Sequence, residues 1–257
     1  MTSLITGASS GIGLELARVF AEHGYDVVLV ARSEARLQTL AAELQTKGVR
    51  AQVIVSDLSA PGGAALVAQR VADLGLTIDV LVNNAGHGTY GPFLETPWET
   101  ELSIIQVNIV ALTELTKRLL PAMVARKSGR ILNVASTAAF LPGPLMAVYY
   151  ASKAYVLSFS EAIANELAGS GVTVTVLAPG PTESGFQTAA ALGESKLVAG
   201  RKLPTSREVA RAAYAGVMAG KPLVVPGLMN KLTIQLPRFT PRRMVASMVR
   251  NVQERRR

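Results

Sequence analysis

Close to its start the chain reads Ser3-Leu-Ile-Thr-Gly-Ala-Ser-Ser-Gly-Ile-Gly13, in which a short apolar run leads directly into three closely spaced glycines. The apolar run predicts a β-strand and the residues after it predict a helix. The glycines allow a tight turn, and they let the backbone approach a pyrophosphate at the helix N-terminus, where free N–H groups favour anions. A turn without a ligand is the alternative interpretation. The predicted contacts of a dinucleotide here are Gly7, Ser9, Ser10, Gly11, Ile12 and Gly13.

Outward from this stretch, apolar and β-branched runs alternate with amphipathic helical patterns, which indicates βαβ units and a parallel sheet. Because most of the predicted strands are apolar throughout, we expect helices on both faces. The predicted fold is therefore α/β, a Rossmann-type, doubly wound, seven-stranded parallel sheet. The predicted strands are Ser3–Thr6, Asp26–Ala31, Ala51–Ser56, Val80–Asn83, Gly129–Ala135, Val172–Ala178 and Leu223–Val225, with helices near 12–23, 33–47, 61–74, 98–126, 149–168 and 206–219.

The composition favours one large domain. The chain has 257 residues, of which 49% are hydrophobic and 17% are charged, enough for a substantial core. It has no cysteine, which excludes disulfides, thiolate zinc sites and a cysteine nucleophile, and two isolated histidines make a histidine-based metal site unfavourable. The first residues must already form a strand, so we expect no secretory signal and a cytoplasmic protein. We predict a catalytic domain over 1–227 and an extension over 228–257.

A proton-transfer pattern lies in the middle of the chain. Tyr149 and Lys153 are four residues apart, and Ser136 lies thirteen residues upstream of the tyrosine. Tyrosine has a pKa of about 10, so it is a weak acid near neutrality. A lysine ammonium one helical turn away favours the phenolate and should lower that pKa. Tyr150 is also present, but a helical step of about 100° points it away from the lysine.

With these motifs the chain resembles the short-chain dehydrogenase/reductase family, in its single-domain branch. The resemblance covers about residues 2 to 227, and it implies an oxidoreductase that interconverts a carbonyl and an alcohol by hydride transfer. It is carried by the glycine triplet, Asp57, Asn83-Asn84-Ala85-Gly86, Asn108, Ser136, Tyr149-x-x-x-Lys153 and Pro179-Gly180.

The resemblance assigns the catalytic roles. Tyr149 would be the general acid in reduction and the base in oxidation. Lys153 would lower the pKa of Tyr149 and hydrogen-bond the nicotinamide ribose. Ser136 would orient and polarise the carbonyl. Asn108 would hold a water that links Lys153 to solvent.

The residue after the second strand bears on the choice of dinucleotide. NAD sites commonly place a carboxylate there, whereas this chain has Ala31-Arg32. Arg32 can pair with a 2′-phosphate through its guanidinium fork. We therefore expect NADP(H) in preference to NAD(H), the alternative being a solvated arginine at the strand end.

The remaining cofactor contacts follow from the resemblance alone. A carboxylate after the third strand would meet the adenine, and an asparagine-rich segment after the fourth would contact the adenosine ribose, unless it only forms a turn. A hydroxyl after Pro179-Gly180 would contact the nicotinamide carboxamide, from either Thr182 or Ser184. His87 is expected to be a loop or packing residue, with a substrate contact as the alternative. These cofactor residues are Asp57, Leu58, Asn84, Ala85, Gly86, Tyr149, Lys153, Pro179, Gly180 and Thr182.

Two regions bear on the substrate. The segment 181–205 follows the sixth strand, where doubly wound sheets bind ligands, and is expected to form a substrate lid. An ordinary loop is the alternative. Apolar residues near the catalytic motifs would form either a wall for an apolar substrate or ordinary core. These residues are Phe140, Leu141, Met146 and Phe186.

The net charge of +8 is concentrated at the C-terminus, where the sequence from Asn230 onward contains eight basic residues and a single acidic residue, Glu254. Residues Pro241–Arg257 are predicted to form a basic amphipathic helix. We expect this helix to dock on its own domain or on a partner subunit, with peripheral contact to an anionic membrane as the alternative. No aromatic stacking residues accompany the charge, which argues against nucleic acid. The expected apolar face is Met244, Val245, Met248 and Val252.

The predicted function is an NADP(H)-dependent carbonyl reductase or alcohol dehydrogenase with a small-molecule, apolar substrate. One alternative is a specialised ketoacyl or steroid reductase with the same catalytic residues. Another is a dinucleotide-binding sensor without turnover. The resemblance further implies a homodimer or homotetramer that pairs through helices 98–126 and 149–168.

Overall fold

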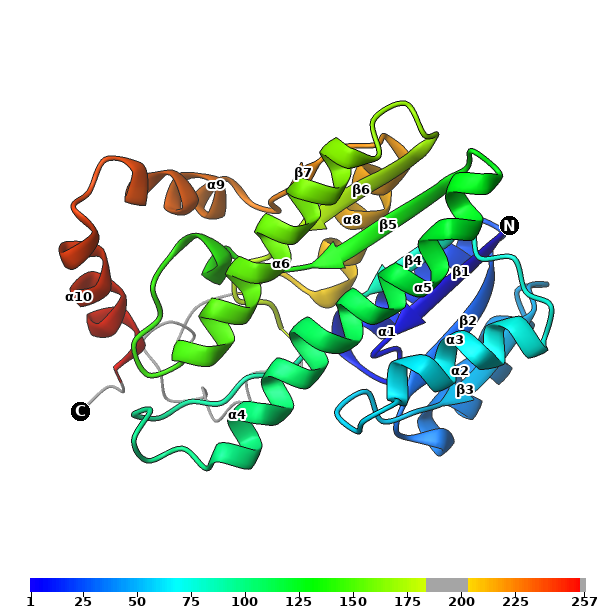
Figure 1. Ribbon diagram of the computed structural model, residues 1–257, viewed down its shortest axis with the longest axis horizontal. Helices are drawn as coiled ribbons and strands as arrows, with labels where there is room; N and C mark the ends of the chain where they lie inside the picture. Colours follow the sequence, from blue (N-terminus) through cyan, green and yellow to red (C-terminus); the bar gives the residue numbers. More distant parts are fainter. Residues whose placement is uncertain (184–202, 255–257) are drawn as a thin grey trace.

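The computed structural model describes residues 1–183 and 203–254, and within these ranges it forms a parallel sheet covered by helices (Figure 1). All the strands pair in parallel, in the order β3-β2-β1-β4-β5-β6-β7. This confirms the predicted doubly wound α/β fold. The strands are β1 Thr2–Thr6, β2 Asp26–Ala31, β3 Ala51–Val55, β4 Val80–Asn83, β5 Gly129–Val134, β6 Val172–Leu177 and β7 Leu223–Val224.

The helices lie close to the predicted ranges, with one change of type. The helix predicted over 98–126 contains a π-helical segment, η1 (Gln106–Ala111), between two α-helices. Such segments are rare and are frequent at functional sites. The α-helices in this part of the chain are α1 Gly11–Glu22, α2 Glu34–Gln45, α3 Gly63–Asp73, α4 Trp98–Ile105, α5 Leu112–Ala125, α6 Ala147–Glu166 and α8 Ser206–Met218.

Side chains alternate between the two faces of the sheet, as the pleat requires. On β1, Ile5 points into a core formed with α1, α2 and α8, while Leu4 points into a second core formed with α3 and α5. Phe20 and Leu37 are fully buried in the first core, and Leu115 is nearly so in the second. Burial on both faces explains why the strands are apolar throughout.

The order of the strands places the site. The connections from β1 run toward β2 and β3, whereas β4 starts the other half of the sheet, so the direction of winding reverses between β1 and β4. Ligands in such sheets bind outside the carboxyl ends of the strands at this reversal. Thr6 and Asn83 end these two strands and therefore border the expected ligand site.

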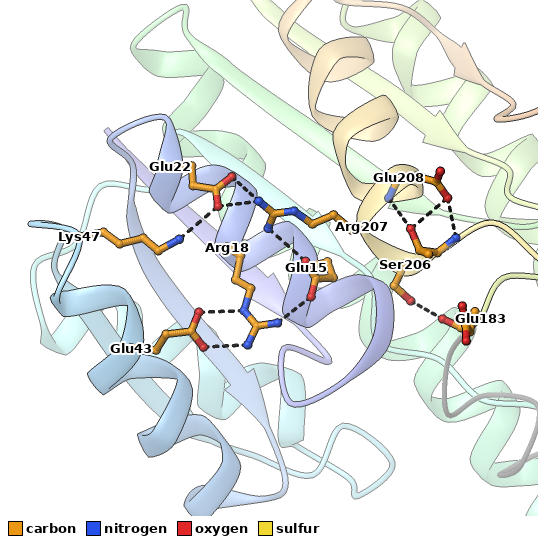
Figure 2. Close-up of polar contacts among 10 residues, drawn as sticks. Glu15, Arg18, Glu22, Glu43, Lys47, Glu183, Ser206, Arg207 and Glu208 are labelled. Carbon is orange, nitrogen blue, oxygen red and sulfur yellow. Dashed lines mark hydrogen bonds and ion pairs between the residues drawn. The ribbon is translucent and has the colours of Figure 1, made fainter.

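An ion-pair network fastens the helices of one face to each other (Figure 2). Arg207, in the first turn of α8, pairs with Glu15 at 3.1 Å and with Glu22 at 2.6 Å, both on α1. Arg18 of α1 pairs in turn with Glu15 and with Glu43 of α2, each at 2.7 Å. The guanidinium of Arg207 lowers the pKa of Glu22 to about 2. The helix that carries the glycine turn is therefore held by charge on two sides.

The chain beyond β7 contains two further helices, α9 (Leu228–Gln235) and α10 (Arg242–Gln253), joined through the 3₁₀ turn η3 (Leu236–Arg238). Figure 1 shows both at the side of the molecule toward which the strands point. α9 buries Ile234 against Ala178 and Val225. The helix α9 has no counterpart among the predicted elements.

The helix α10 confirms the amphipathic pattern but corrects its inner face. Val245 is buried, whereas Met244, Met248 and Val252 are exposed. Val249, one turn after Val245, packs against a cluster that contains Met146 and Tyr150. The helix is rotated relative to the prediction, because its docking face is completed by a polar residue, Gln253, that is fully buried.

Within residues 1–183 and 203–254, none of the helices combines the length and the apolar character that crossing a bilayer requires.

Candidate active site

The glycine turn forms a cradle that side chains would fill. Gly7 and Gly11 have φ angles of +68° and +56°, which favour glycine. A Cβ added to Gly13 would lie 2.4 Å from the carbonyl oxygen of Gly7, so the strand and the helix approach too closely there for any side chain. Ser10, the N-cap of α1, makes no side-chain cap hydrogen bond, so it does not occupy the backbone N–H groups of the first turn. This arrangement fits the pyrophosphate of a dinucleotide.

The side chain of Asn84 supports this turn. Its Nδ2 donates to the carbonyl oxygen of Thr6 at 2.9 Å, and its backbone N–H donates to Oγ1 of Thr6 at 3.0 Å. Ala85 donates to the same hydroxyl at 3.0 Å. The side chain of Asn84 therefore stabilises the turn, as the alternative interpretation of this residue predicted. Gly86 is exposed, and a Cβ there would lie 3.2 Å from Nζ of Lys153, so this segment joins the cradle to the predicted catalytic lysine.

The expected adenine contacts lie after β3, and the expected 2′-phosphate contact, Arg32, lies after β2. The carboxylate of Asp57 accepts hydrogen bonds from the backbone N–H and the hydroxyl of Ser59, at 2.9 and 2.7 Å. These bonds, and more weakly the charge of Arg32, lower the pKa of Asp57, which is ionised at neutral pH. Arg32 itself is exposed at the end of β2. Leu58 is buried in the core, so only its backbone could meet a ligand.

A cavity of about 450 Å³ lies between α1 and α2. It adjoins the glycine turn at Ser9 and Ser10, where Ile12 packs against the core rather than facing solvent. Arg36, one turn after Arg32, lines its other wall. The cavity therefore offers hydroxyl groups and an arginine beside the cradle.

Tyr149 and Lys153 lie on the same face of α6, with Nζ of Lys153 5.8 Å from the centroid of the Tyr149 ring. The lysine is buried and donates a hydrogen bond to the carbonyl oxygen of Val134 at 2.9 Å. Burial lowers the pKa of Lys153 to about 8. Burial also raises the pKa of Tyr149, against a smaller opposing effect of its hydrogen bond with Ser136. This corrects the expectation of a lowered tyrosine pKa, because the loss of hydration outweighs the neighbouring polar groups.

Asn108 lies in the π-helical segment η1 and is almost completely buried. Its Nδ2 donates to Oγ of Ser152 at 2.9 Å and to the carbonyl oxygen of His87 at 3.1 Å, and its Oδ1 accepts from the backbone N–H of His87 at 3.2 Å. The ring of His87 in turn hydrogen-bonds Ser103. These contacts favour the loop interpretation of His87. Asn108 thus joins the end of β4, η1 and α6 beside Lys153.

The comparisons with known proteins bear on this geometry. A family model described as short chain dehydrogenase matches residues 1–194. The chain belongs to the short-chain dehydrogenase family. A short chain dehydrogenase of Pseudocercospora fijiensis is 39% identical over 186 residues, which make up 71% of this chain and 60% of that protein.

A second relative and a solved structure support the same assignment. A very-long-chain 3-oxoacyl-CoA reductase of Pyrenophora tritici-repentis is 37% identical over 177 residues, 67% of this chain and 52% of that protein. The chain therefore spans only about half to three fifths of the length of these two relatives. A short-chain dehydrogenase from Sphingobium yanoikuyae in complex with NADPH superimposes with a TM-score of 0.82 at 33% identity, covering 93% of this chain and 96% of that one.

In the present chain, the last group of expected cofactor contacts, which begins with Pro179-Gly180, lies after β6. The hydroxyl of Ser136 and the backbone N–H of Thr137 both donate to the carbonyl oxygen of Pro179, at 3.3 and 2.9 Å. Thr182 is buried and its hydroxyl donates to the carbonyl oxygen of Gly180 at 3.0 Å. The structure thus places Pro179 next to Ser136, the predicted catalytic serine, and Thr182 next to Gly180. Ser184, Phe186 and most of the expected lid lie outside the described residues.

The surroundings of Tyr149 include residues for which the sequence predicted no role in the site. Tyr150 packs edge-on against Tyr149, with 6.0 Å between the ring centroids, and its ring lies directly over Gly143, where a Cβ would come within 2.0 Å. Gln253 hydrogen-bonds the hydroxyl of Tyr150. A polar residue at the end of a basic helix gives no sequence signal for such a contact. The contact of Gly143 with Tyr150 could not be predicted either, because Gly143 lies in a Pro-Gly-Pro loop.

The proposed apolar wall divides into two parts. Leu141 and Met146 pack in the cluster that contains both tyrosines. Phe140 packs instead against two other clusters, which include Val156 and Ala178. Phe140 is therefore core, while Leu141 and Met146 adjoin Tyr149, the predicted general acid.

Among the described residues, no group of three or more histidine, aspartate and glutamate side chains is placed to hold a metal ion.

Proposed function

We propose that the protein is an NADP(H)-dependent oxidoreductase that interconverts a carbonyl and an alcohol. One observation carries the proposal: Ser136, Tyr149 and Lys153 converge beside the dinucleotide cradle, with Asn108 joining the supporting elements. A sensor without turnover would have no use for a buried phenol and a buried lysine held together in this way.

The proton chemistry follows from the two buried groups. Because burial raises the pKa of Tyr149, its phenol is protonated at neutral pH and can act as a general acid. Lys153, with a pKa of about 8, is largely an ammonium at pH 7, and its charge stabilises the phenolate that remains after Tyr149 has given up its proton. Ser136 lies between Tyr149 and Pro179 and can hydrogen-bond the oxygen that gains charge. A bound NADPH would supply the hydride.

The preference for NADP(H) rests on Arg32. The position after β2 carries an exposed guanidinium whose charge acts on Asp57, in place of the carboxylate typical of NAD sites. Arg36 lines the adjoining cavity and adds a second positive charge. The Sphingobium structure, solved with NADPH, supports this proposal.

For the substrate, we propose an apolar carbonyl compound, with 3-oxoacyl derivatives as the first class to test. The apolar cluster around Tyr149 and Met146 favours an apolar group beside the reacting carbon. The relative named very-long-chain 3-oxoacyl-CoA reductase supports an acyl chain.

The activity is tested by NADPH oxidation with a panel of aliphatic, aromatic and 3-oxoacyl carbonyls. We expect Tyr149→Phe to lower kcat by roughly 10²- to 10⁴-fold, as for the loss of a general acid. Tyr150→Phe is the matched control, since it removes the neighbouring hydroxyl and leaves that of Tyr149. Tight NADPH binding without turnover of any carbonyl would instead favour the sensor.

The cofactor preference is tested by fluorescence titration with NADPH and NADH. We expect NADPH to bind more tightly to the wild type, and Arg32→Ala to abolish the difference. Equal binding of the two by the wild type, unchanged in Arg32→Ala, would contradict the assignment and direct the substrate screen to NAD and alcohols.

We also propose that 1–227 form the catalytic domain and 228–257 an extension, and that the protein is a cytoplasmic homodimer or homotetramer. Leu102, Val110 and Tyr155 are exposed on α4, η1 and α6, the helices expected to pair. Sedimentation should show an oligomer that Val110→Lys dissociates.

The extension is also a candidate for peripheral membrane contact. Leu228, Met229 and Phe239 are exposed next to the basic residues Lys231 and Arg238. Such a surface is suited to anionic lipids. Cosedimentation with anionic vesicles, and not with zwitterionic ones, is the expected result. Equal binding to both would contradict it.

A further inference from the structure

A second cavity lies beneath the C-terminal helix α10 and is bordered by Tyr150. It has a volume of about 180 Å³, lies between the loop before α6, the α9–η3 segment and α10, and is partly open to solvent. Its walls are almost entirely apolar, and include Leu141, Leu236, Val249 and Val252. An apolar cavity of about 150 Å³ in a protein core stays dry and can bind benzene. This one is large enough for a six-carbon ring or a chain of similar length.

A fully buried polar side chain borders this apolar space. Gln253 lines the cavity with a side chain that is fully buried, and its Nε2 donates to Oη of Tyr150. Within residues 1–183 and 203–254, its Oε1 is buried without a hydrogen-bond partner. Whichever way the amide is turned, one of its two polar atoms is left unpaired. A buried amide atom without a partner is unfavourable unless a ligand or a water satisfies it.

We propose that this cavity binds the distal apolar end of the substrate, a group of about six carbon atoms that carries one hydroxyl or N–H donor for Gln253. The cavity shares Tyr150 and Leu141 with the cluster in which Tyr149 packs, so it adjoins the reacting centre. That the ligand is part of the substrate rests on the proposed reductase function. The existence of a binding site in the cavity does not depend on that function.

The first experiment uses a pair of small probes that differ only in the polar group, phenol and toluene, with binding measured by calorimetry on the full chain. We expect the wild type to prefer phenol. Gln253→Leu keeps the size of the side chain and removes the amide, so phenol should bind roughly tenfold more weakly, as for the loss of one hydrogen bond, and the preference should shift to toluene.

A cavity-filling variant shows where the probes bind. Val249→Phe should abolish the binding of both probes, because its ring occupies the space. Met244→Phe is the matched control, since Met244 lies on the exposed face of α10. Failure of phenol to bind the wild type, or unchanged binding in Val249→Phe with α10 still folded, would overturn the site.

The second experiment connects the cavity to catalysis. Carbonyl substrates that end in a hydroxylated six-carbon group should lose kcat/KM in Val249→Phe through a higher KM, while short carbonyls keep theirs. If the probes bind as expected but both substrate classes respond equally, the site is separate from the substrate. If no carbonyl is reduced by the wild type, the proposed function fails, and the probe experiment still decides the site.

Discussion

The carboxamide of Gln253 hydrogen-bonds the phenol oxygen of Tyr150, across 103 positions of the sequence. The same residue accepts a hydrogen bond from Oη of Tyr90 at its backbone carbonyl, at 3.0 Å. The last turn of α10 is thereby fastened both to the first turn of α6 and to the loop after β4. The C-terminal helix consequently packs around Tyr150, and Val249 of the same helix belongs to the cluster that contains Tyr149, the proposed general acid.

The Gln253–Tyr150 contact should matter for stability. Tyr150→Phe removes one partner and leaves the buried amide of Gln253 without it, which costs about 1–3 kcal/mol. In a chain of this size the unfolding temperature should fall by roughly 2–4 °C for each kcal/mol. Calorimetry measures the shift, and activity on a short carbonyl should stay close to that of the wild type. An unchanged unfolding temperature would show that α10 does not depend on this contact.

The pH dependence of the reaction should report on Lys153. Its pKa of about 8 means that the ammonium is lost as the pH rises through 8, while the raised pKa of Tyr149 keeps the phenol protonated. Reduction should therefore slow above about pH 8, because the charge that stabilises the phenolate disappears. Oxidation, which needs the phenolate, should gain rate with increasing pH.

Two variants test this assignment in pH–rate profiles. Lys153→Arg should remove the break near pH 8, because the guanidinium does not titrate in this range. His87→Gln is the control, since burial lowers the pKa of His87 and the ring is already neutral above neutral pH. If the break in the pH–rate profile moved in His87→Gln, the assignment of the titration to Lys153 would be wrong.

The sequence predicted the sheet well because its strands are buried on both faces, and a continuous apolar run records that directly. It did not predict η1, since a π-helical turn inserts a residue without changing which side chains are apolar. The prediction of the buried face of α10 was wrong for a related reason. Hydropathy favoured Met244, Met248 and Val252, whereas Gln253 is buried through a hydrogen bond that hydropathy counts against burial.

Some features of the candidate site could likewise be predicted from the sequence, and others could not. The spacing of Tyr149 and Lys153 predicted their shared helical face, because four residues make about one turn. The direction of the tyrosine pKa shift depends on how much water surrounds the ring, and that follows only from the packing of the loop and α10 around it. The support of the glycine turn by Asn84 likewise depends on β4 lying beside β1.

The glycine cradle makes a sharp prediction. In Gly13→Ala the new Cβ would lie 2.3 Å from Nδ2 of Asn84 and 2.4 Å from the carbonyl oxygen of Gly7, so the turn must open. We expect kcat/KM for NADPH to fall on the order of 10²-fold, as for misplaced binding groups, with the circular dichroism unchanged. Gly24→Asn is the control, since its position has open space and asparagine tolerates a positive φ. Normal NADPH kinetics in Gly13→Ala would show that the cradle is not the cofactor site.

The ion pairs of Arg207 should make stability depend on acid. Glu22 has a folded-state pKa of about 2 against an ordinary value of 4.5, so its stabilising contribution is complete above pH 4.5 and is lost as the pH falls toward 2. Arg207→Met should therefore lower the free energy of unfolding at pH 7 by about 1 kcal/mol, because partly exposed pairs contribute little each. The difference from the wild type should shrink at pH 3 and in high salt.

Denaturant unfolding at pH 7 and pH 3 measures this difference. Arg211→Met is the matched control, because Arg211 is exposed on the same helix and forms no ion pair within the described residues. Oγ of Ser206, at the start of α8, also donates to the carbonyl oxygen of Glu183 at 2.9 Å (Figure 2). If Arg207 holds α8 to α1 as the contacts indicate, its loss should also raise the KM for NADPH, since the glycine turn begins the same helix α1. A stability difference that does not change between pH 7 and pH 3 would mean that Arg207 acts through packing of its methylene groups, not through its charge.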